Sequence, residues 1–289
     1  MSGIPTAPDG WRVLGRRSSG PFTTSVTYLR PDGRRIEWSS RAHRKGSGRR
    51  VAGTDRRDHP YWAPRRAWWW MAVLFVLGSA CFVVGPIPAF LNLVGPETDA
   101  VVFFVGSLLF TAAAALQLRE TLRTDHSSPA STGHRVRWFA WEPHRIDWWS
   151  SVVQLVGTLF FNITTFRALS TTIDSPSYDR VVWRPDAFGS AAFLIAGALA
   201  YVEVSGHLWH RPPRTIEGRL VAVNLFGCVA FGLSAVAAYV LPTTGSEVNV
   251  AIANLTTSVG ALAFLVGALM LLPEGVAADK HASDQREES

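Results

Sequence analysis

The chain has 289 residues, a formal net charge of +6 and a mean hydropathy of +0.14. Charged residues gather at the two ends and in short connections, and the sequence between them consists of long apolar runs. This segregation excludes an ordinary soluble domain, and the position of Cys81 and Cys228 inside apolar runs excludes an extracellular disulfide framework.

The first predicted element is a basic cytoplasmic segment, residues 1–58. Within it, two alternating, β-prone runs flank Pro31-Asp32-Gly33, a strong turn signal, and predict a β-hairpin over about residues 22–40. Residues 41–58 are rich in Gly, Arg and Asp, which predicts a flexible tether. Because polybasic residues beside a membrane helix attract anionic lipid, we expect these lipids as partners here rather than nucleic acid.

Six apolar runs follow, each with almost no internal charge and each about 20 residues long, the length needed to cross a bilayer. Only a helix satisfies every backbone polar group within one such segment. We therefore predict an all-α transmembrane domain over residues 59–275 and a disordered tail over 276–289. The helices are expected near residues 67–90, 100–118, 149–169, 187–208, 220–241 and 248–272.

The positive charges predict the orientation of these helices. The connections after the second and fourth helices carry several arginines, whereas the opposite connections are mainly acidic. By the positive-inside rule, both termini then lie in the cytoplasm, and the predicted location is the inner membrane, with the lipid bilayer as a partner. The arginines are Arg119, Arg123, Arg135, Arg137 and Arg145, followed by Arg211, Arg214 and Arg219.

A Gly-x-x-x-Phe pattern occurs once in each of the six runs. Small residues allow membrane helices to approach closely, and a phenylalanine on one helix would fill the gap that a facing glycine leaves. We therefore predict a six-helix bundle made of three related two-helix hairpins with their small faces turned inward. The packing glycines are Gly78, Gly106, Gly157, Gly189, Gly227 and Gly260.

Each returning helix carries a glutamate 14 residues after its glycine: Glu120, Glu203 and Glu274. Glu203 is followed four residues later by His207, which predicts an i,i+4 pair on one helical face. Acids inside the bundle would handle a cation or a proton, whereas acids at helix ends would reach interfacial water and neighbouring arginines. Their position close to the helix ends favours the second interpretation.

Two amides, Gln154 and Asn224, lie three residues before the glycine of the third and fifth helices. Amides in membrane helices most often bond to a neighbouring helix, which favours cross-helix hydrogen bonds over ligand binding. No Cys–His grouping has zinc spacing, and no nucleophile triad or phosphate-binding loop stands out. The sequence therefore predicts no catalytic residue, no metal ligand and no cofactor.

The stretches GSLLFTAAAALQL, GTLFFNITTF and WRPDAFGSAAFLIAGALAYVE resemble the YrhK-like family of bacterial multi-pass membrane proteins. That family is built on short two-helix units, and its long versions occur in high-GC bacteria such as actinomycetes. The resemblance covers the six helices but not residues 1–66. It implies no particular activity, so it assigns no catalytic residues.

Three functions stay open. The first is a non-enzymatic membrane protein that binds or passes a small solute or ion, with Glu203 as its main polar contact. The second is a membrane-anchored interaction protein that recruits a protein partner or lipid through its basic N-terminal segment. The third is a membrane enzyme subunit that binds haem, quinone or lipid; because no catalytic motif stands out, we rank it last.

Overall fold

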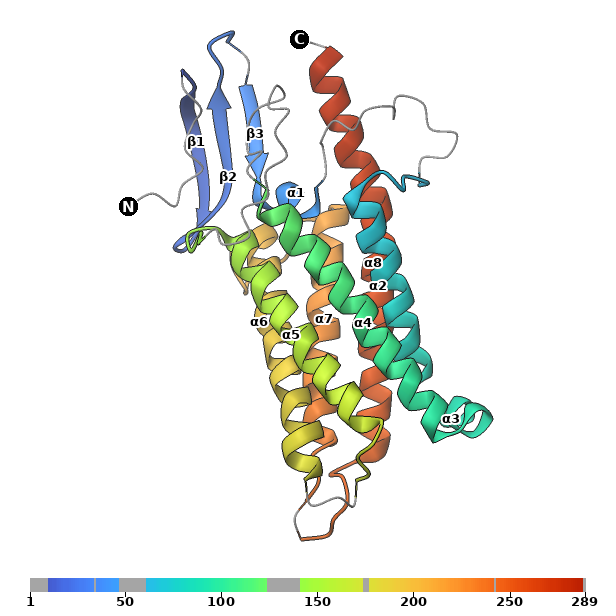
Figure 1. Ribbon diagram of the computed structural model, residues 1–289. Coiled ribbons are helices and arrows are strands. Elements are labelled where there is room, and N and C mark those ends of the chain that lie inside the picture. The colour runs from blue at the N-terminus through green and yellow to red at the C-terminus, as the bar shows by residue number, and fades with distance from the viewer. Residues whose placement is uncertain are drawn as a thin grey trace.

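The computed structural model describes residues 10–33, 35–46, 61–123, 141–173, 177–241 and 243–287, with side chains described up to residue 280. These residues form a small antiparallel sheet, six long helices and three short helical segments (Figure 1). The sheet and the C-terminal part of the last helix lie at the same end of the helix bundle, which we call the sheet end (Figure 1).

The sheet has three strands in the order β1 (Arg12–Ser19), β2 (Phe22–Leu29) and β3 (Arg35–Ser39). β2 and β3 form the expected hairpin, in which Tyr28 lies opposite Ile36. Its turn includes Gly33, whose φ of +82° favours glycine and whose N–H donates to Arg30 O at 3.0 Å. The sequence does not predict β1, because nearly all of its residues are exposed and it lacks a buried alternate face.

The six long helices form a closed ring. Each packs against two neighbours, in the order α2, α4, α5, α6, α7, α8 and back to α2. Consecutive helices therefore pair as three hairpins, and the third hairpin packs against the first. Their bounds are α2 (Ala67–Val84), α4 (Pro96–Thr121), α5 (Ile146–Ala168), α6 (Arg184–Ser205), α7 (Ile216–Ala237) and α8 (Val250–Glu287), with a π-helical turn, η1 (Asp179–Trp183), leading into α6.

Five helices in the described part of the chain are long and apolar enough to cross a membrane: α2, α4, α6 together with η1, α7 and α8. Large apolar side chains such as Phe188, Ile195 and Leu233 are exposed on the outside of the ring, as in a protein solvated by lipid. The prediction of a multi-pass membrane protein is confirmed in this form. α5 is more polar because it places four hydroxyl side chains in the bundle interior: Ser150, Ser151, Thr158 and Thr165.

Within each hairpin, the glycine of one helix faces the phenylalanine of the other. A Cβ added at Gly157 would lie 2.7 Å from Phe193 Cδ1, and a Cβ at Gly189 would lie 3.2 Å from Phe161 Cδ2. The absent side chains thus let the two backbones approach closely. The same reciprocal contact joins Gly78 to Phe110, Gly106 to Phe82, Gly227 to Phe264 and Gly260 to Phe231.

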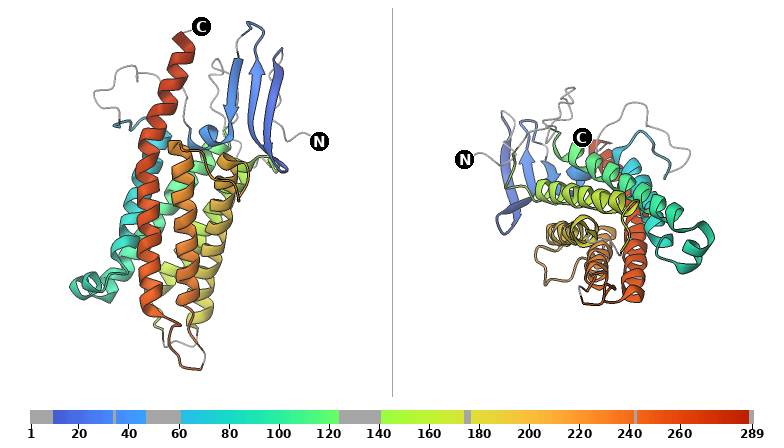
Figure 2. Two further views of the ribbon diagram at one scale, coloured as in Figure 1. Left: turned by 180° about the vertical axis from the view of Figure 1, so that it is seen from behind. Right: turned by 60° about the horizontal axis from the view of Figure 1, so that its bottom comes forward.

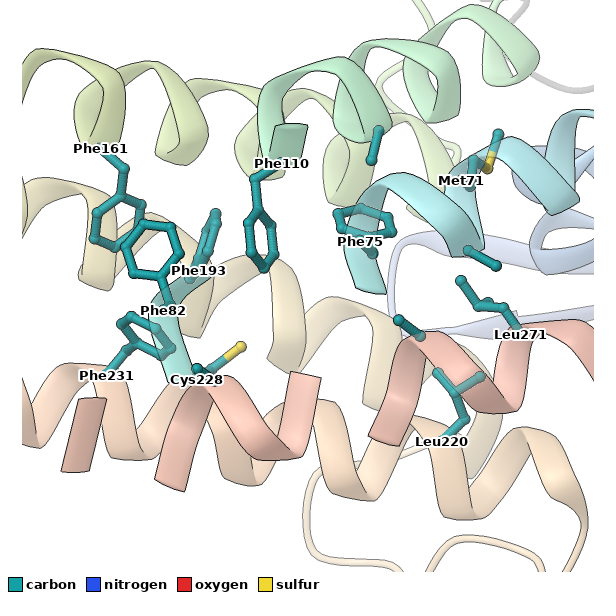
Figure 3. Packing of buried hydrophobic residues seen from close by; sticks show 14 residues of the cluster. Met71, Phe75, Phe82, Phe110, Phe161, Phe193, Leu220, Cys228, Phe231 and Leu271 are labelled. Atoms are coloured by element: carbon teal, nitrogen blue, oxygen red, sulfur yellow. The ribbon is translucent and has the colours of Figure 1, made fainter. Parts of the chain in front are cut away.

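Phenylalanines from five of the helices gather in the middle of the bundle (Figure 3), and Phe264 of α8 packs against them. Ring centroids lie 4.9 Å apart for Phe161–Phe193 within one hairpin and 6.1 Å apart for Phe82–Phe231 between hairpins. Most of these rings meet edge to face or tilted, the arrangement favoured by the aromatic quadrupole. We call this set the phenylalanine layer: Phe82, Phe110, Phe161, Phe193, Phe231 and Phe264.

The first predicted helix, 67–90, is divided in the structure. α2 ends at Val84, because Gly85 and Pro86 follow and proline has no N–H to continue the helix. A separate short helix, α3 (Pro88–Val94), then projects sideways at the end of the bundle opposite the sheet (Figure 2).

The structure also differs from the predicted disordered tail, residues 276–289. α8 continues to Glu287 and projects beyond the other helices at the sheet end (Figure 2). Asp279 holds this extension against the start of α2, since it accepts a hydrogen bond from Trp68 Nε1 at 3.2 Å and lies 3.3 Å from Arg66 Nε. These contacts are far apart in the sequence, so composition alone does not predict them.

Candidate functional site

The candidate site is organised by a short helix, α1 (Ser40–Lys45), which directly follows β3 and lies at the sheet end of the ring (Figure 1). A helix this short is unstable alone, so tertiary contacts must hold it. Arg41, Arg44 and Lys45 are each at most 5% exposed. This differs from the flexible tether expected over 41–58, of which residues 47–58 lie outside the described part of the chain.

Glu274 of α8 binds two cations of α1. Arg41 Nε donates to Glu274 Oε1 at 2.7 Å, and Arg41 Nη2 donates to the other carboxylate oxygen at 3.3 Å. Lys45 Nζ also donates to Glu274. All three side chains are buried, so these ion pairs are shielded from solvent screening.

Glu203 of α6 binds the opposite side of α1. Its Oε2 accepts a hydrogen bond from Arg44 Nη2 at 2.6 Å, and its Oε1 accepts one from Ser40 Oγ at 2.6 Å. Arg44 Nη1 donates further to Ser150 Oγ of α5 at 2.6 Å. A single arginine therefore connects α1 to two helices of the ring.

Glu120 of α4 completes the set of three predicted acids. A Cβ added at Gly46, which ends α1 with a φ of +62°, would lie 2.8 Å from Glu120 Oε2. The same carboxylate pairs with Arg123 at 3.1 Å. All three glutamates thus contact α1 or its C-cap, where they neither point to interfacial water nor form an open acidic ring.

The predicted Glu203–His207 pair is wrong. α6 ends at Ser205, and Gly206 adopts a φ of +80°, so the chain leaves the helix before His207. His207 is exposed and its ring lies 5.4 Å from that of His210. The i,i+4 spacing holds only within a continuous helix, and the glycine between the two residues interrupts it.

A second buried cluster fastens α1 to the start of α5. His43 Nδ1 lies 3.4 Å from Asp147 Oδ2 and accepts a hydrogen bond from Arg145 Nη2 at 2.7 Å. Arg145 Nε donates to Asp147 Oδ1 at 3.1 Å, and its guanidinium lies 5.4 Å from the ring centroid of Trp38 in β3. The cluster therefore ties the sheet, α1 and α5 together.

The two cations that share Glu274 differ in proton affinity. Burial, and then repulsion from Arg41, lowers the pKa of Lys45 to about 7 in spite of the attraction of Glu274. Burial also acts on Arg41, but there Glu274 outweighs it and the pKa is raised. Lys45 is therefore the α1 cation that can lose its proton near neutral pH.

A cavity of about 90 Å³ lies between α1 and the phenylalanine layer. Arg41, Arg44 and Lys45 line one end of it, and the layer lines the other with Phe110, Phe193 and Phe264. A buried water needs roughly 10–15 Å³ by this measure. The cavity can therefore hold several waters or one small solute.

Three amides line the wall of this cavity: Gln117, Gln154 and Asn224. Their side chains form no hydrogen bond with the described part of the chain, and Gln117 Oε1 is buried without a partner there. Asn224 packs so tightly on Gly267 that a Cβ at Gly267 would overlap its Oδ1. The expected cross-helix bonds of Gln154 and Asn224 are thus not observed.

One further pattern in the sequence indicates this site. Arg41, Arg44 and Lys45 have i, i+3 and i+4 spacing, which places them on adjacent parts of a helix surface. Three basic residues so spaced complement three glutamates at equivalent positions in the returning helices. The three amides of the cavity wall have no comparable sequence signal. Gln154 and Asn224 each lie three residues before the glycine of a Gly-x-x-x-Phe pattern, but Gln117 does not.

Fold and site together define a multi-pass membrane protein with a cavity covered by its own N-terminal helix. Comparisons of the chain with protein-family models, with curated proteins and with solved structures find no match. The resemblance to the YrhK-like family therefore stays a prediction. The described residues contain no group of three or more His, Cys, Asp or Glu that could hold a metal ion.

Proposed function

We propose that this is a six-span inner-membrane protein of the YrhK-like type that binds a small solute in the cavity beneath α1. In this proposal α5 is the sixth span, because it occupies a full place in the ring between α4 and α6. The arginines near the sheet end favour a cytoplasmic position for that end. α1 then acts as a lid that opens to the cytoplasm.

The observation that carries the proposal is a cavity whose wall holds amides without a hydrogen-bond partner in the described part of the chain. A buried polar group without a partner costs about 1–3 kcal/mol. Gln117 is only 7% exposed, and its Oε1 accepts no hydrogen bond from the described residues. A bound solute, together with waters, would supply hydrogen-bond partners for the amide groups that face the cavity.

The phenylalanine layer favours binding over passage in this conformation. Rings from all six helices meet at the bottom of the cavity, and Phe110–Phe264 and Phe193–Phe264 are 6.0 and 5.9 Å apart between centroids. A solute that crossed the bundle would have to separate these contacts. Movement of α1, by contrast, would open the cavity without disturbing the layer.

The alternative function, recruitment through the basic N-terminal segment, is less favoured. Arg41, Arg44 and Lys45 belong to that segment, but they are buried against Glu203 and Glu274. They are therefore not available to anionic lipid or to a protein partner unless α1 leaves the bundle. Contacts of this kind by residues 47–58 remain a prediction.

Cys228 provides a direct test, because it lines the cavity and is one of only two cysteines. In a Cys81→Ala background, we would measure its reaction with a small methanethiosulfonate reagent in sealed inside-out and right-side-out vesicles. Glu203→Gln, which breaks the contact with Arg44, should accelerate labelling at least tenfold, and only from the cytoplasmic side.

The matched control is Glu97→Gln, which changes an exposed carboxylate in the first turn of α4. It should leave the labelling rate unchanged. Equal rates for the Glu203→Gln and Glu97→Gln variants would show that α1 does not control access to the cavity. Faster labelling from the periplasmic side would overturn the proposed orientation.

A further inference from the structure

We propose that the solute of this cavity is a short-chain monocarboxylate, held with its carboxylate toward α1 and its apolar chain toward the phenylalanine layer. This inference rests on the proposed function, since it names the chemical class that the same cavity would take. It depends on three features: the charge at one end of the cavity, an unpartnered donor there, and the apolar character of the other end.

All charged residues that line the cavity are cationic: Arg41, Arg44 and Lys45. Glu203 and Glu274, the carboxylates that form ion pairs with them, lie outside the lining and supply two negative charges for three positive ones. Glu217 also attracts Arg41 but lies outside both the lining and these ion pairs. With all three cations protonated, one positive charge is left at this end of the cavity. An anion of single charge would balance it, whereas a cation would meet repulsion.

Arg44 also offers a donor without an acceptor. Its side chain is buried, and its Nε has no hydrogen-bond partner among the described residues, although its two terminal nitrogens bind Ser150 and Glu203. A carboxylate oxygen would accept a charge-assisted hydrogen bond from such an N–H group. The amide NH₂ groups of Gln154 and Asn224 supply further donors on the wall.

The opposite end of the cavity excludes a second charge. It is formed by Phe110, Phe193 and Phe264, and apolar side chains including Leu220 and Leu271 extend this surface toward α1. Burying a second carboxylate there without a partner would be strongly unfavourable. A short hydrocarbon chain, by contrast, gains about 0.8 kcal/mol for each CH₂ group that it buries. The volume limits that chain to a few carbons.

The test uses the full chain in nanodiscs of phosphatidylcholine, a lipid without net charge, and isothermal titration calorimetry at constant ionic strength and at pH 6, where most of Lys45 is protonated. The probes are sodium butyrate, its neutral isostere butyramide, and sodium chloride. We expect butyrate to bind at least tenfold more tightly than butyramide, and chloride not to displace it. Comparable binding of butyramide, or displacement by chloride, would overturn the monocarboxylate assignment.

Two variants distinguish the cavity from other binding surfaces. Ala200→Leu adds bulk to the cavity wall and should abolish butyrate binding, whereas Ala191→Leu, on the exposed face of the same helix, should not. Arg44→Gln should weaken butyrate binding at least tenfold and butyramide binding by much less, because only the anion loses a charged partner. Butyrate binding that survives Ala200→Leu would place the site elsewhere and refute the inference.

Failure of this inference can be separated from failure of the proposed function. If butyrate does not bind but Cys228 labelling still responds to Glu203→Gln, the ligand class is wrong and the lid stands. If neither experiment responds, the lid and the solute site both fail.

Discussion

Glu274→Gln is the substitution that best tests how α1 is held. The change keeps the size of the side chain but removes the carboxylate that Arg41 and Lys45 share, and all three residues are at most 7% exposed. Removing one partner of a buried ion pair costs about 3–5 kcal/mol, because a buried charge is left uncompensated. At about 1.4 kcal/mol per factor of ten, opening of α1 should become roughly a hundredfold to a few thousandfold more frequent.

Lys45 makes this cost dependent on pH. Glu274 raises the pKa of Lys45, and its removal takes that pKa below the present value of about 7. At pH 6 part of the Lys45 population must still carry an unbalanced charge, whereas at pH 9 Lys45 is neutral and only Arg41 is left unpaired. The loss of protection should therefore be larger at pH 6 than at pH 9.

Hydrogen exchange of the backbone amides in α1, followed by mass spectrometry, measures this opening directly. Protection factors corrected for intrinsic exchange should fall in Glu274→Gln, while those of the central turns of α5 should stay unchanged. Glu97→Gln is the control, because it removes an exposed carboxylate. Unchanged protection of α1 in Glu274→Gln would refute the view that buried charge pairs hold the lid.

Two further predictions concern the lid and the helix packing. Lys45 and Lys280 are the only lysines in the sequence, so NMR of protein labelled with [ε-¹³C]lysine can follow Lys45, which should titrate near pH 7. In the unfolded chain Lys45 keeps its proton up to about pH 10.5. The unfolding free energy should therefore rise between pH 7 and pH 10.5 by up to about 1.4 kcal/mol per pH unit. A Lys45 titration above pH 10, or no loss of that slope in Lys45→Met, would contradict the burial argument. Gly157→Ala should destabilise the bundle by about 1–3 kcal/mol, because its Cβ would lie 2.7 Å from Phe193. Adding Phe193→Leu to this variant should restore part of the lost stability, which thermal unfolding of the single and double variants measures. Gly15→Ala, where a Cβ meets nothing within 4 Å, is the harmless control, and equal losses at the two glycines would exclude the packing explanation.

The helical part of the fold is largely readable from the sequence. Apolar runs of membrane length must be helical, because lipid offers no partner for a backbone N–H or C=O group. The Gly-x-x-x-Phe pattern also indicates which faces meet, as the contacts of Gly157 with Phe193 and of Gly189 with Phe161 illustrate. Both signals are local, since each is carried by residues of a single helix.

The candidate site is only partly readable in the same way. Glu120, Glu203 and Glu274 stand out because they recur at one register, but their partners do not. Arg41 lies 233 residues from Glu274, in a stretch whose composition resembles a linker. For His207 the sequence predicts a contact that does not form. Its i,i+4 spacing from Glu203 implies one helical face, but the positive φ of Gly206 ends the helix between the two residues.

Local sequence is enough to specify apolar helices in pairs, with glycine and phenylalanine on the contacting faces. These properties follow from the solvent and from the helical repeat, which act on each segment separately. The position of a six-residue basic helix over the bundle, and the cavity beneath that helix, depend instead on contacts between distant segments. That helix gains its stability from carboxylates on distant segments, and the cavity is the space that six closed helices leave unfilled, so neither can be assigned to a local stretch of sequence.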